Sequence, residues 1–426
     1  MEKNDIRYIT YLNILKEELV PAMGCTEPIA IAYAAAKAGQ VLGKMPEHVV
    51  VEASGSIIKN VKSVIVPNTG NLKGIPAAAI AGIVAGNPEK KLEVLAEIDE
   101  KAKKKIKEEM EEIQVETKHI KTGHVFDLAV TEYAGDSYVK VRIADHHTNI
   151  VLIEKNHETL YSREEMLSEN EKSDTDRSLL NMKDIWDFVN SVDVKDVSKI
   201  LNQQILCNSA IAEEGLLGDY GANIGSVLLK AHVNDVSNRA KAKAAAGSDA
   251  RMNGCELPVI INSGSGNQGI TCSVPLIEYA KELQSGKEKL YRALVLSNLV
   301  AIHEKTGIGT LSAYCGAVSA GAGAGAGIAY LCGGDYETVI HTVVNALAIV
   351  SGIVCDGAKA SCAAKIASSV DAGILGYEMF KNGQEFKGGD GIVMHDIEST
   401  IEGIGKLGKD GMRETNEEII RLMIAN

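Results

Sequence analysis

The sequence predicts an α+β protein in which a mainly helical catalytic bundle is joined to a smaller α+β domain, an antiparallel sheet with helices. Short alternating strands and turns occupy residues 46–160, whereas helical periodicity continues from about residue 181 nearly to the end. The 426 residues are 45% hydrophobic but only 4% aromatic. The core must therefore be built by close packing of small and aliphatic side chains.

Three segments are expected along the chain. Residues 1–45 should form N-terminal helices that pack with the catalytic bundle. Residues 46–160 should form the α+β domain, and residues 161–426 the helical catalytic domain. The charged stretch 155–180 is predicted to be a surface excursion between the two domains.

The first predicted helix covers residues 5–19 and stops at Pro21. A second helix should begin at GCTEP, residues 24–28, where Thr26 can cap it. Cys25 then precedes a helix N-terminus, where the helix dipole favours a thiolate. A buried cysteine in a turn is the alternative interpretation.

Residues 48–66 alternate well enough for two strands around Gly55. The loop PNTGNLKGIP follows and feeds a small-residue helix, so it is either an anion cradle or an ordinary strand-to-helix turn. A helix and four strands come next, the strands at 111–119, 125–133, 137–145 and 148–154. In the turn 144–149, neighbouring histidines should point to opposite faces, which argues against joint metal ligation but allows one of them to face a pocket.

The helical half contains a polar loop and a glycine-rich run. NSGSGNQG, residues 262–269, leads into a helix that should begin near Gly269, and its backbone donors suit a carboxylate. Residues 310–331, with the run GAVSAGAGAGAG, are predicted to form a buried helix rather than a silk-like strand. A further apolar helix at 337–351 leads directly to Cys355.

Cys355 and Cys362 lie close together in CDGAKASC. On one continuous helix their Cα atoms would be roughly 10 Å apart, too far for a disulfide. Gly357 can break that helix and let the segment fold around an ion or cluster. Together with Cys315 the pair could hold a 4Fe–4S cluster through three thiolates, which leaves one iron free as a Lewis acid. Zinc is the competing metal, although the CxxC knuckles that its closed sites favour are missing.

Charge and composition narrow the classes of partner. The net charge of −13 argues against nucleic acid, and the basic run KAKKKIK sits among glutamates as a solvated helix face. The charged N-terminus does not match a secretory signal, and no long apolar run predicts a membrane span. We therefore expect a cytoplasmic protein whose eight cysteines are thiols or ligands before they are disulfides.

The order of GCTEP, NSGSGNQG, AYCGAVSAG and CDGAKASC resembles the L-cysteine desulfidase family and, more distantly, the iron–sulfur L-serine dehydratases. The resemblance covers nearly the whole chain. It implies a 4Fe–4S cluster on Cys315, Cys355 and Cys362, with Cys25 as catalytic base or as a displaceable fourth ligand. It also implies β-elimination of L-cysteine to sulfide, ammonia and pyruvate without pyridoxal phosphate. The sequence ends in RLMIAN, so Cys25 is expected to replace the C-terminal thiol that such dehydratases use.

The expected partner is a small amino-acid substrate, and a homodimer is compatible with the sequence. The expected substrate-binding residues are Thr26, Glu27, Ser263, Ser265, Asn267 and Gln268, with Asn68, Thr69, Asn71 and Lys73 closing the pocket from the first domain. Cys207 and Cys332 are predicted to be buried structural thiols, whereas Cys272 lies nearer the pocket. Two other functions stay open: an L-serine dehydratase, and a non-catalytic small-molecule binder on the same fold.

Overall fold

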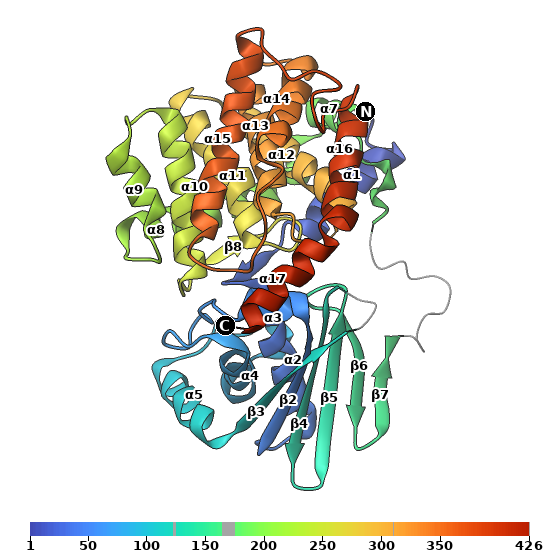
Figure 1. Ribbon diagram of the computed structural model, residues 1–426, viewed down its shortest axis with the longest axis vertical. Helices are drawn as coiled ribbons and strands as arrows, with labels where there is room; N and C mark the ends of the chain where they lie inside the picture. Colours follow the sequence, from blue (N-terminus) through green and yellow to red (C-terminus); the bar gives the residue numbers. More distant parts are fainter. Residues whose placement is uncertain (122–124, 164–174, 310, 426) are drawn as a thin grey trace.

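The computed structural model describes residues 1–121, 125–163, 175–309 and 311–425. They form a helical bundle and a smaller body built on a sheet, and helix α17 (Arg413–Ala425) lies at the junction of the two (Figure 1). The predicted α+β class is confirmed. Within the described ranges, no helix combines the length and apolarity needed to span a membrane.

The small body is built on a mixed sheet with the strand order β3-β2-β4-β5-β6-β7. Its strands are β2 (His48–Ser54), β3 (Gln114–Ile120), β4 (Asp127–Ala134), β5 (Ser137–Ala144), β6 (Ile150–Lys155) and β7 (Glu158–Ser162). β2 and β3 are parallel, and the other neighbouring pairs among these strands are antiparallel. The predicted antiparallel sheet is therefore wrong at β2–β3, because a helical connection separates those strands and returns the chain in the same direction.

Five helical segments accompany this sheet. They are α2 (Thr26–Leu42), α3 (Gly55–Val61), α4 (Gly74–Ala85), the 3-10 turn η1 (Pro88–Glu93) and α5 (Glu100–Glu112). α2 packs on β4 and β5, and α4 packs on α2. A Cβ added to Gly82 would lie 2.2 Å from the carbonyl oxygen of Ala32, so these two helices meet backbone to backbone.

Helix α3 replaces part of the strand pair predicted for residues 48–66. The chain leaves the sheet after Ser54, and α3 begins at Gly55. A side chain would not fit at Gly55, because a Cβ there would lie 2.9 Å from Ile420 of α17 and 3.0 Å from His119 of β3. Ile57 and Val61 are then buried on the inner side of the helix. This departure places α3 beside the bundle.

The N-terminal segment divides between the two bodies. Helix α1 (Ile6–Glu18) packs into the core of the bundle, whereas α2 packs into the core of the sheet body. Between them, β1 (Pro21–Met23) pairs with β8 (Pro258–Ile260) of the bundle. Residues 1–45, expected to pack with the bundle, therefore contribute to both cores: α1 to that of the bundle and α2 to that of the sheet body. In the predicted surface stretch 155–180, residues 158–162 form β7, and residues 164–174 lie outside the described ranges.

The bundle is arranged around α13 (Gly316–Leu331), the glycine- and alanine-rich run, which is helical as predicted. The other helices are α7 (Met182–Ser191), α8 (Val194–Leu217), α9 (Ile224–Ala231), α10 (Val236–Met252), α11 (Gly266–Glu282), α12 (Lys287–Ile308), α14 (Tyr336–Val350), α15 (Cys362–Lys381) and α16 (Ile397–Lys406), with the short turns η2 (Arg177–Leu179) and η3 (Leu407–Gly411). Helices α11, α12, α14 and α15 all pack against α13. Its glycines let two of these neighbours approach to backbone contact.

One added methyl group should disturb the close contact between α13 and α15 at Gly321. A Cβ at Gly321 would lie 2.4 Å from the carbonyl oxygen of Ser369 in α15. Gly321→Ala should therefore lower the free energy of unfolding by about 1–3 kcal/mol or more, as overpacking does. Urea-induced unfolding measures this. Gly352→Ala, where nothing lies within 4 Å, is the matched control. Equal stability of the two variants would contradict the packing argument.

The sheet body buries an unpaired carboxyl group whose ionisation should oppose folding. Glu132 of β4 is fully buried, and neither of its carboxyl oxygens has a hydrogen-bond partner among the described residues. Burial raises the pKa of Glu132 from 4.5 to about 8. The folded state therefore binds more protons than the unfolded state between these two values, and stability falls as pH rises through this window. Glu132→Gln should stabilise the protein at pH 8 and much less at pH 5, as thermal unfolding would show. The exposed Glu158→Gln should produce no such pH-dependent difference.

Candidate functional site

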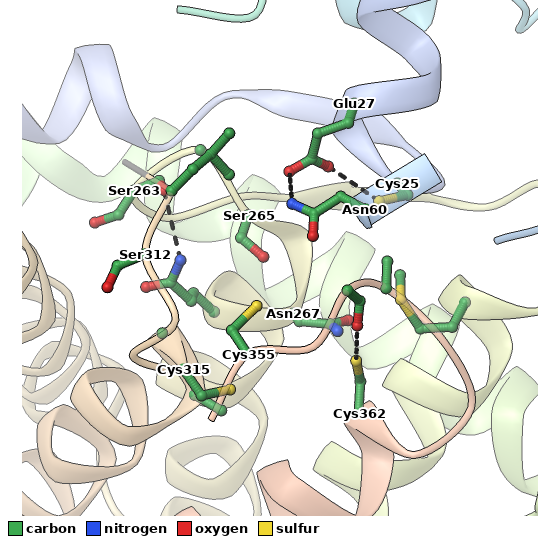
Figure 2. A pocket seen from close by; sticks show the side chains of 18 of the residues that line it. Cys25, Glu27, Asn60, Ser263, Ser265, Asn267, Ser312, Cys315, Cys355 and Cys362 are labelled. Carbon is green, nitrogen blue, oxygen red and sulfur yellow. Dashed lines mark hydrogen bonds between the residues drawn. The ribbon is translucent and has the colours of Figure 1, made fainter. Parts of the chain in front are cut away.

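A cavity of about 110 Å³ lies between the two bodies. Its walls come from the start of α2, from α3, from the loop at residue 147, from the loop 263–268, from the ends of α10 and α12, and from the segments 311–317 and 355–362. Figure 2 shows Cys25, Glu27 and Asn60 on one side of it and Cys315, Cys355 and Cys362 on the other. All four cysteines predicted to act together therefore line the same cavity.

A short backbone pairing positions two of these thiols. Tyr314 and Val354 form an antiparallel bridge, flanked by hydrogen bonds from Cys315 N to the Ile353 carbonyl (3.1 Å) and from Cys355 N to the Ala313 carbonyl (2.6 Å). Successive residues of extended chain point to opposite faces, so Cys315 and Cys355, each one step from the bridged pair, project from the same face. They form a diagonal pair, for which the typical Cα separation is about 7–8 Å.

The third thiol comes from a loop that turns back toward the sheet body. Residues 352–361 are not helical, and α15 begins at Cys362, so Cys355 and Cys362 do not share one helix. Gly357 supplies the expected break, with φ of +93°. A Cβ at this glycine would lie 2.3 Å from the Lys59 carbonyl oxygen of α3. The close approach brings the loop against the sheet body, and the Cys362 thiol then donates to the Gly357 carbonyl at 3.6 Å.

Cys25 is the N-cap of α2 and is 3% exposed. It packs in a small apolar cluster with Val64 and Met252, against which Cys362 also packs. Its thiol donates to Glu27 Oε2 at 3.1 Å. Burial, and then the charge of Glu27, raise the pKa of Cys25 well above its usual range. Burial therefore opposes the thiolate that the position before a helix N-terminus was expected to favour.

Glu27 is a buried, well-bonded carboxylate. Asn60 Nδ2 of α3 donates to its Oε1 at 2.8 Å, and His147 Nε2 lies 3.9 Å from the same oxygen. Burial opposes the charge of Glu27, but His147, Cys25 and Asn60 together hold its pKa below the usual range. Thr26 is not the cap and does not line the cavity. Its hydroxyl donates to the Gly264 carbonyl at 3.0 Å and so ties α2 to the polar loop.

The polar loop contributes the four residues predicted from NSGSGNQG. Ser263, Ser265, Asn267 and Gln268 all line the cavity. Helix α11 begins at Gly266 rather than near Gly269, so three of them belong to its cap and first turn. The loop is fastened to the bundle beneath it by Asn262, whose Nδ2 donates to Asn298 Oδ1 at 2.9 Å.

The loop predicted to close the pocket from the first domain does not line this cavity. Asn68 Nδ2 donates to the Leu95 carbonyl, Thr69 Oγ1 donates to the Val66 carbonyl, and Lys73 is the N-cap of α4. These bonds hold together the turn that leads from α3 into α4, so the segment is neither part of the cavity nor the expected strand-to-helix turn. Cys272 also lies away from the cavity, buried against Ala301 and Ala320.

The remaining cysteines differ from their predictions in burial. Cys207 and Cys332, expected to be buried, are both partly exposed. Cys207 lies on α8, and Cys332 is the C-cap of α13. Both pack against the core of the bundle while keeping part of their surface exposed, and the apolar sequence around them did not reveal this.

Buried cations around the cavity were missed by the sequence analysis. Lys305, near the end of α12, lines the cavity, and burial lowers its pKa to about 8 against the opposing effect of Cys355 and Cys315. Lys59 Nζ donates to the Cys355 carbonyl at 3.1 Å. Arg251 ends α10 and also lines the cavity. No local pattern marks these positions, since each cation becomes adjacent to the cysteines only through tertiary packing.

The cavity lining also contains several buried polar atoms without a partner. Among the described residues, they are Asn60 Oδ1, His147 Nε2, Arg251 Nε, Asn267 Oδ1 and Gln268 Oε1. Buried polar groups are normally hydrogen-bonded, so a concentration of unpaired ones in one cavity indicates a site for a polar ligand. In the same described ranges, no three His, Cys, Asp or Glu side chains are arranged to hold a metal ion as they stand.

Comparison with known proteins gives the class. The family model for the serine dehydratase alpha chain matches residues 89–421, and the chain belongs to that family, one of iron–sulfur-dependent lyases. Among similar proteins, a UPF0597 protein of Desulfitobacterium hafniense is 62% identical over 100% of this chain and 98% of its own length. UPF0597 proteins of Lachnoclostridium phytofermentans and Treponema denticola are 53% and 47% identical, over 98% and 100% of this chain and 100% of each relative.

The contact between Cys25 and Glu27 should affect how fast the Cys25 thiol is alkylated. In the metal-free protein, iodoacetamide should alkylate Cys25 slowly at pH 8, because its raised pKa leaves little thiolate. Glu27→Gln removes the neighbouring charge, which helps to raise the pKa of Cys25, and should therefore accelerate the reaction. Peptide mass spectrometry follows each site separately. Cys207, on α8, is the internal control, and equal acceleration at Cys207 would contradict a local effect.

Proposed function

We propose that this chain is a cytoplasmic, pyridoxal-phosphate-independent iron–sulfur lyase that eliminates sulfide from L-cysteine. The observation that carries the proposal is the convergence of Cys315, Cys355 and Cys362 on one cavity, with Cys25 packed beside Cys362. Three protein thiols are the number that leaves one iron of a 4Fe–4S cluster free for substrate. The small, enclosed cavity suits an amino acid and not a macromolecule.

The donor set suits a 4Fe–4S cluster better than a single ion. Closed zinc sites favour CxxC knuckles, and the sequence contains none. Cys315, Cys355 and Cys362 would each bind a different iron. When bound, the cluster supplies a Lewis acid at its open iron that polarises the Cβ–S bond of the substrate.

The nearby cations favour this use of the thiols. Burial, followed by the charge of Cys355, raises the pKa of Cys315 to about 12, and burial also raises the pKa of Cys362. Metal coordination deprotonates such thiols outright. Lys305 and Lys365 interact electrostatically with these cysteines and would offset the negative charge that then accumulates.

Cys25 is placed to move the proton of the reaction. In the proposed elimination, Cys25 Sγ accepts the Cα proton, the Cβ–S bond breaks with both electrons on sulfur, and a Cα=Cβ double bond forms. The resulting aminoacrylate takes up water and yields pyruvate and ammonia. Cys25 must be ionised to act as a base, and Arg251 is the cation whose charge favours that form. Service as a displaceable fourth ligand is the alternative role for Cys25.

The polar loop would hold the amino-acid head group. Ser263, Ser265, Asn267 and Gln268 offer hydroxyls, amides and the first-turn N–H groups of α11 to a carboxylate or an amine. L-serine carries the same head group, and the matching family is described as a serine dehydratase chain. Dehydration of L-serine to pyruvate is therefore the second candidate reaction.

Anaerobic reconstitution followed by iron and sulfide analysis tests the proposal. The wild-type protein should bind about four irons and release sulfide and pyruvate from L-cysteine. Cys315→Ala, Cys355→Ala and Cys362→Ala should each lose iron and at least about 10³-fold in kcat/KM, because several kcal/mol of transition-state stabilisation disappear with the Lewis acid.

Two sets of controls make the result decisive. Cys332→Ala should keep both iron and activity, and Cys25→Ser should keep iron while losing turnover. A wild-type protein that binds no iron under these conditions would refute the iron–sulfur lyase. Pyruvate release from L-serine that exceeds sulfide release from L-cysteine would replace the first reaction with the second.

A further inference from the structure

We propose that Arg251 is the anchor for the substrate carboxylate and that the site selects zwitterionic α-amino acids by pairing this cation with unpaired amide oxygens. The inference deepens the proposed function, because it concerns the head group of the same substrate. It rests on the burial of Arg251, its lack of a protein partner and its position under the polar loop.

Arg251 is an unusual charge for a protein interior. The residue is 2% exposed, and the structure gives it neither a hydrogen bond nor an ion pair with any described residue. A buried guanidinium without a partner is costly, because arginine stays charged and its five N–H donors lose water. A protein retains such a group where a ligand supplies the missing anion.

The anions of the protein do not fill this role. Glu27 is the nearest carboxylate whose charge acts on Arg251, but its oxygens are engaged by Asn60, Cys25 and Thr26. Cys25 and Cys362 also act on Arg251 electrostatically. Thiolates are single acceptors, whereas the planar guanidinium fork matches the two oxygens of a carboxylate.

The backbone of the polar loop fixes where the guanidinium lies. A Cβ added to Gly266 would lie 2.3 Å from Arg251 Nε and 2.8 Å from its Cζ. Arg251 therefore packs directly against the first residue of α11. Ser265, the N-cap of this 17-residue helix, makes no capping hydrogen bond through its side chain, and it lines the same cavity as Arg251. Its hydroxyl and the first-turn N–H groups are therefore available to the ligand that Arg251 binds.

The α-ammonium group of the substrate would also find acceptors in the cavity. Asn60 Oδ1, Asn267 Oδ1 and Gln268 Oε1 are buried acceptors without partners in the described structure, and all three residues line the cavity. An α-ammonium group carries three N–H donors and no acceptor. The cavity thus offers a cation for the carboxylate and neutral acceptors for the ammonium, which leaves the thiol of the substrate to face the cysteines.

Two half-ligands separate these contacts experimentally. 3-Mercaptopropionate has the thiol and carboxylate of cysteine without the amine, and cysteamine has the thiol and amine without the carboxylate. Arg251→Met should weaken binding of 3-mercaptopropionate about 10- to 100-fold, the range expected for a lost charge-assisted pair, and leave cysteamine within about 3-fold. For L-cysteine, KM should rise and kcat should fall as well, because the charge of Arg251 also favours the ionised form of Cys25. Competitive inhibition and isothermal titration calorimetry measure the affinity for both ligands.

Further variants guard against a merely structural effect. Gly266→Ala keeps the arginine but displaces it, and it should reproduce the selective loss for 3-mercaptopropionate. Arg239 lies on the same helix and pairs with Glu282 at the surface. Arg239→Met should leave the affinity for both ligands unchanged. Iron content should be the same in Arg251→Met and wild type.

The outcomes distinguish this inference from the proposed function. Equal weakening of both half-ligands, or loss of iron in Arg251→Met, would mean that Arg251 supports the fold or the cluster, and the anchor is then refuted. Failure of wild type to bind 3-mercaptopropionate also refutes it. If wild type binds 3-mercaptopropionate through Arg251 but releases no sulfide from L-cysteine, the anchor stands and the lyase proposal fails.

Discussion

The architecture depends on one short backbone pairing, in which residues 313–315 lie antiparallel to residues 353–355. The pairing joins the segment before α13 to the segment after α14 and points Cys315 and Cys355 to one side. Without it, two loops from different places in the sequence would have no fixed relation. Loops carry functional groups well only where a rigid scaffold holds their ends, and here two bundle helices do so.

Small side chains make that scaffold possible. The glycines of α13 allow backbone contact with α12 and α15, and Gly82 does the same for α2 and α4. Helices packed this closely have little freedom to shift, because any bulkier residue would meet a carbonyl oxygen. The low aromatic content of the chain fits this packing, because close contacts between helices, rather than bulky aromatic side chains, fix the helix positions.

The sequence predicted those features that depend on local pattern. The helix over the glycine-rich run, the four cysteines of one site and the polar loop 263–268 followed from periodicity, spacing and family resemblance. Features that depend on packing were missed. The contact of Gly55 with α17 exists only in the folded chain, and Arg251 and Lys305 become cavity residues only when α10 and α12 are assembled. The parallel β2–β3 pair likewise follows from the path of the connecting helices.

Lys59 spans the junction of the two bodies. From α3 its ammonium group reaches both the Cys355 carbonyl of the bundle and Asn416 Oδ1 of α17, at 2.7 Å. Three stretches of chain, the outermost two 357 residues apart, thus share one buried proton donor. The cavity therefore needs residues from both halves of the polypeptide. Neither half, expressed alone, would form the complete cavity. Recombination between distant relatives would have to exchange both halves together.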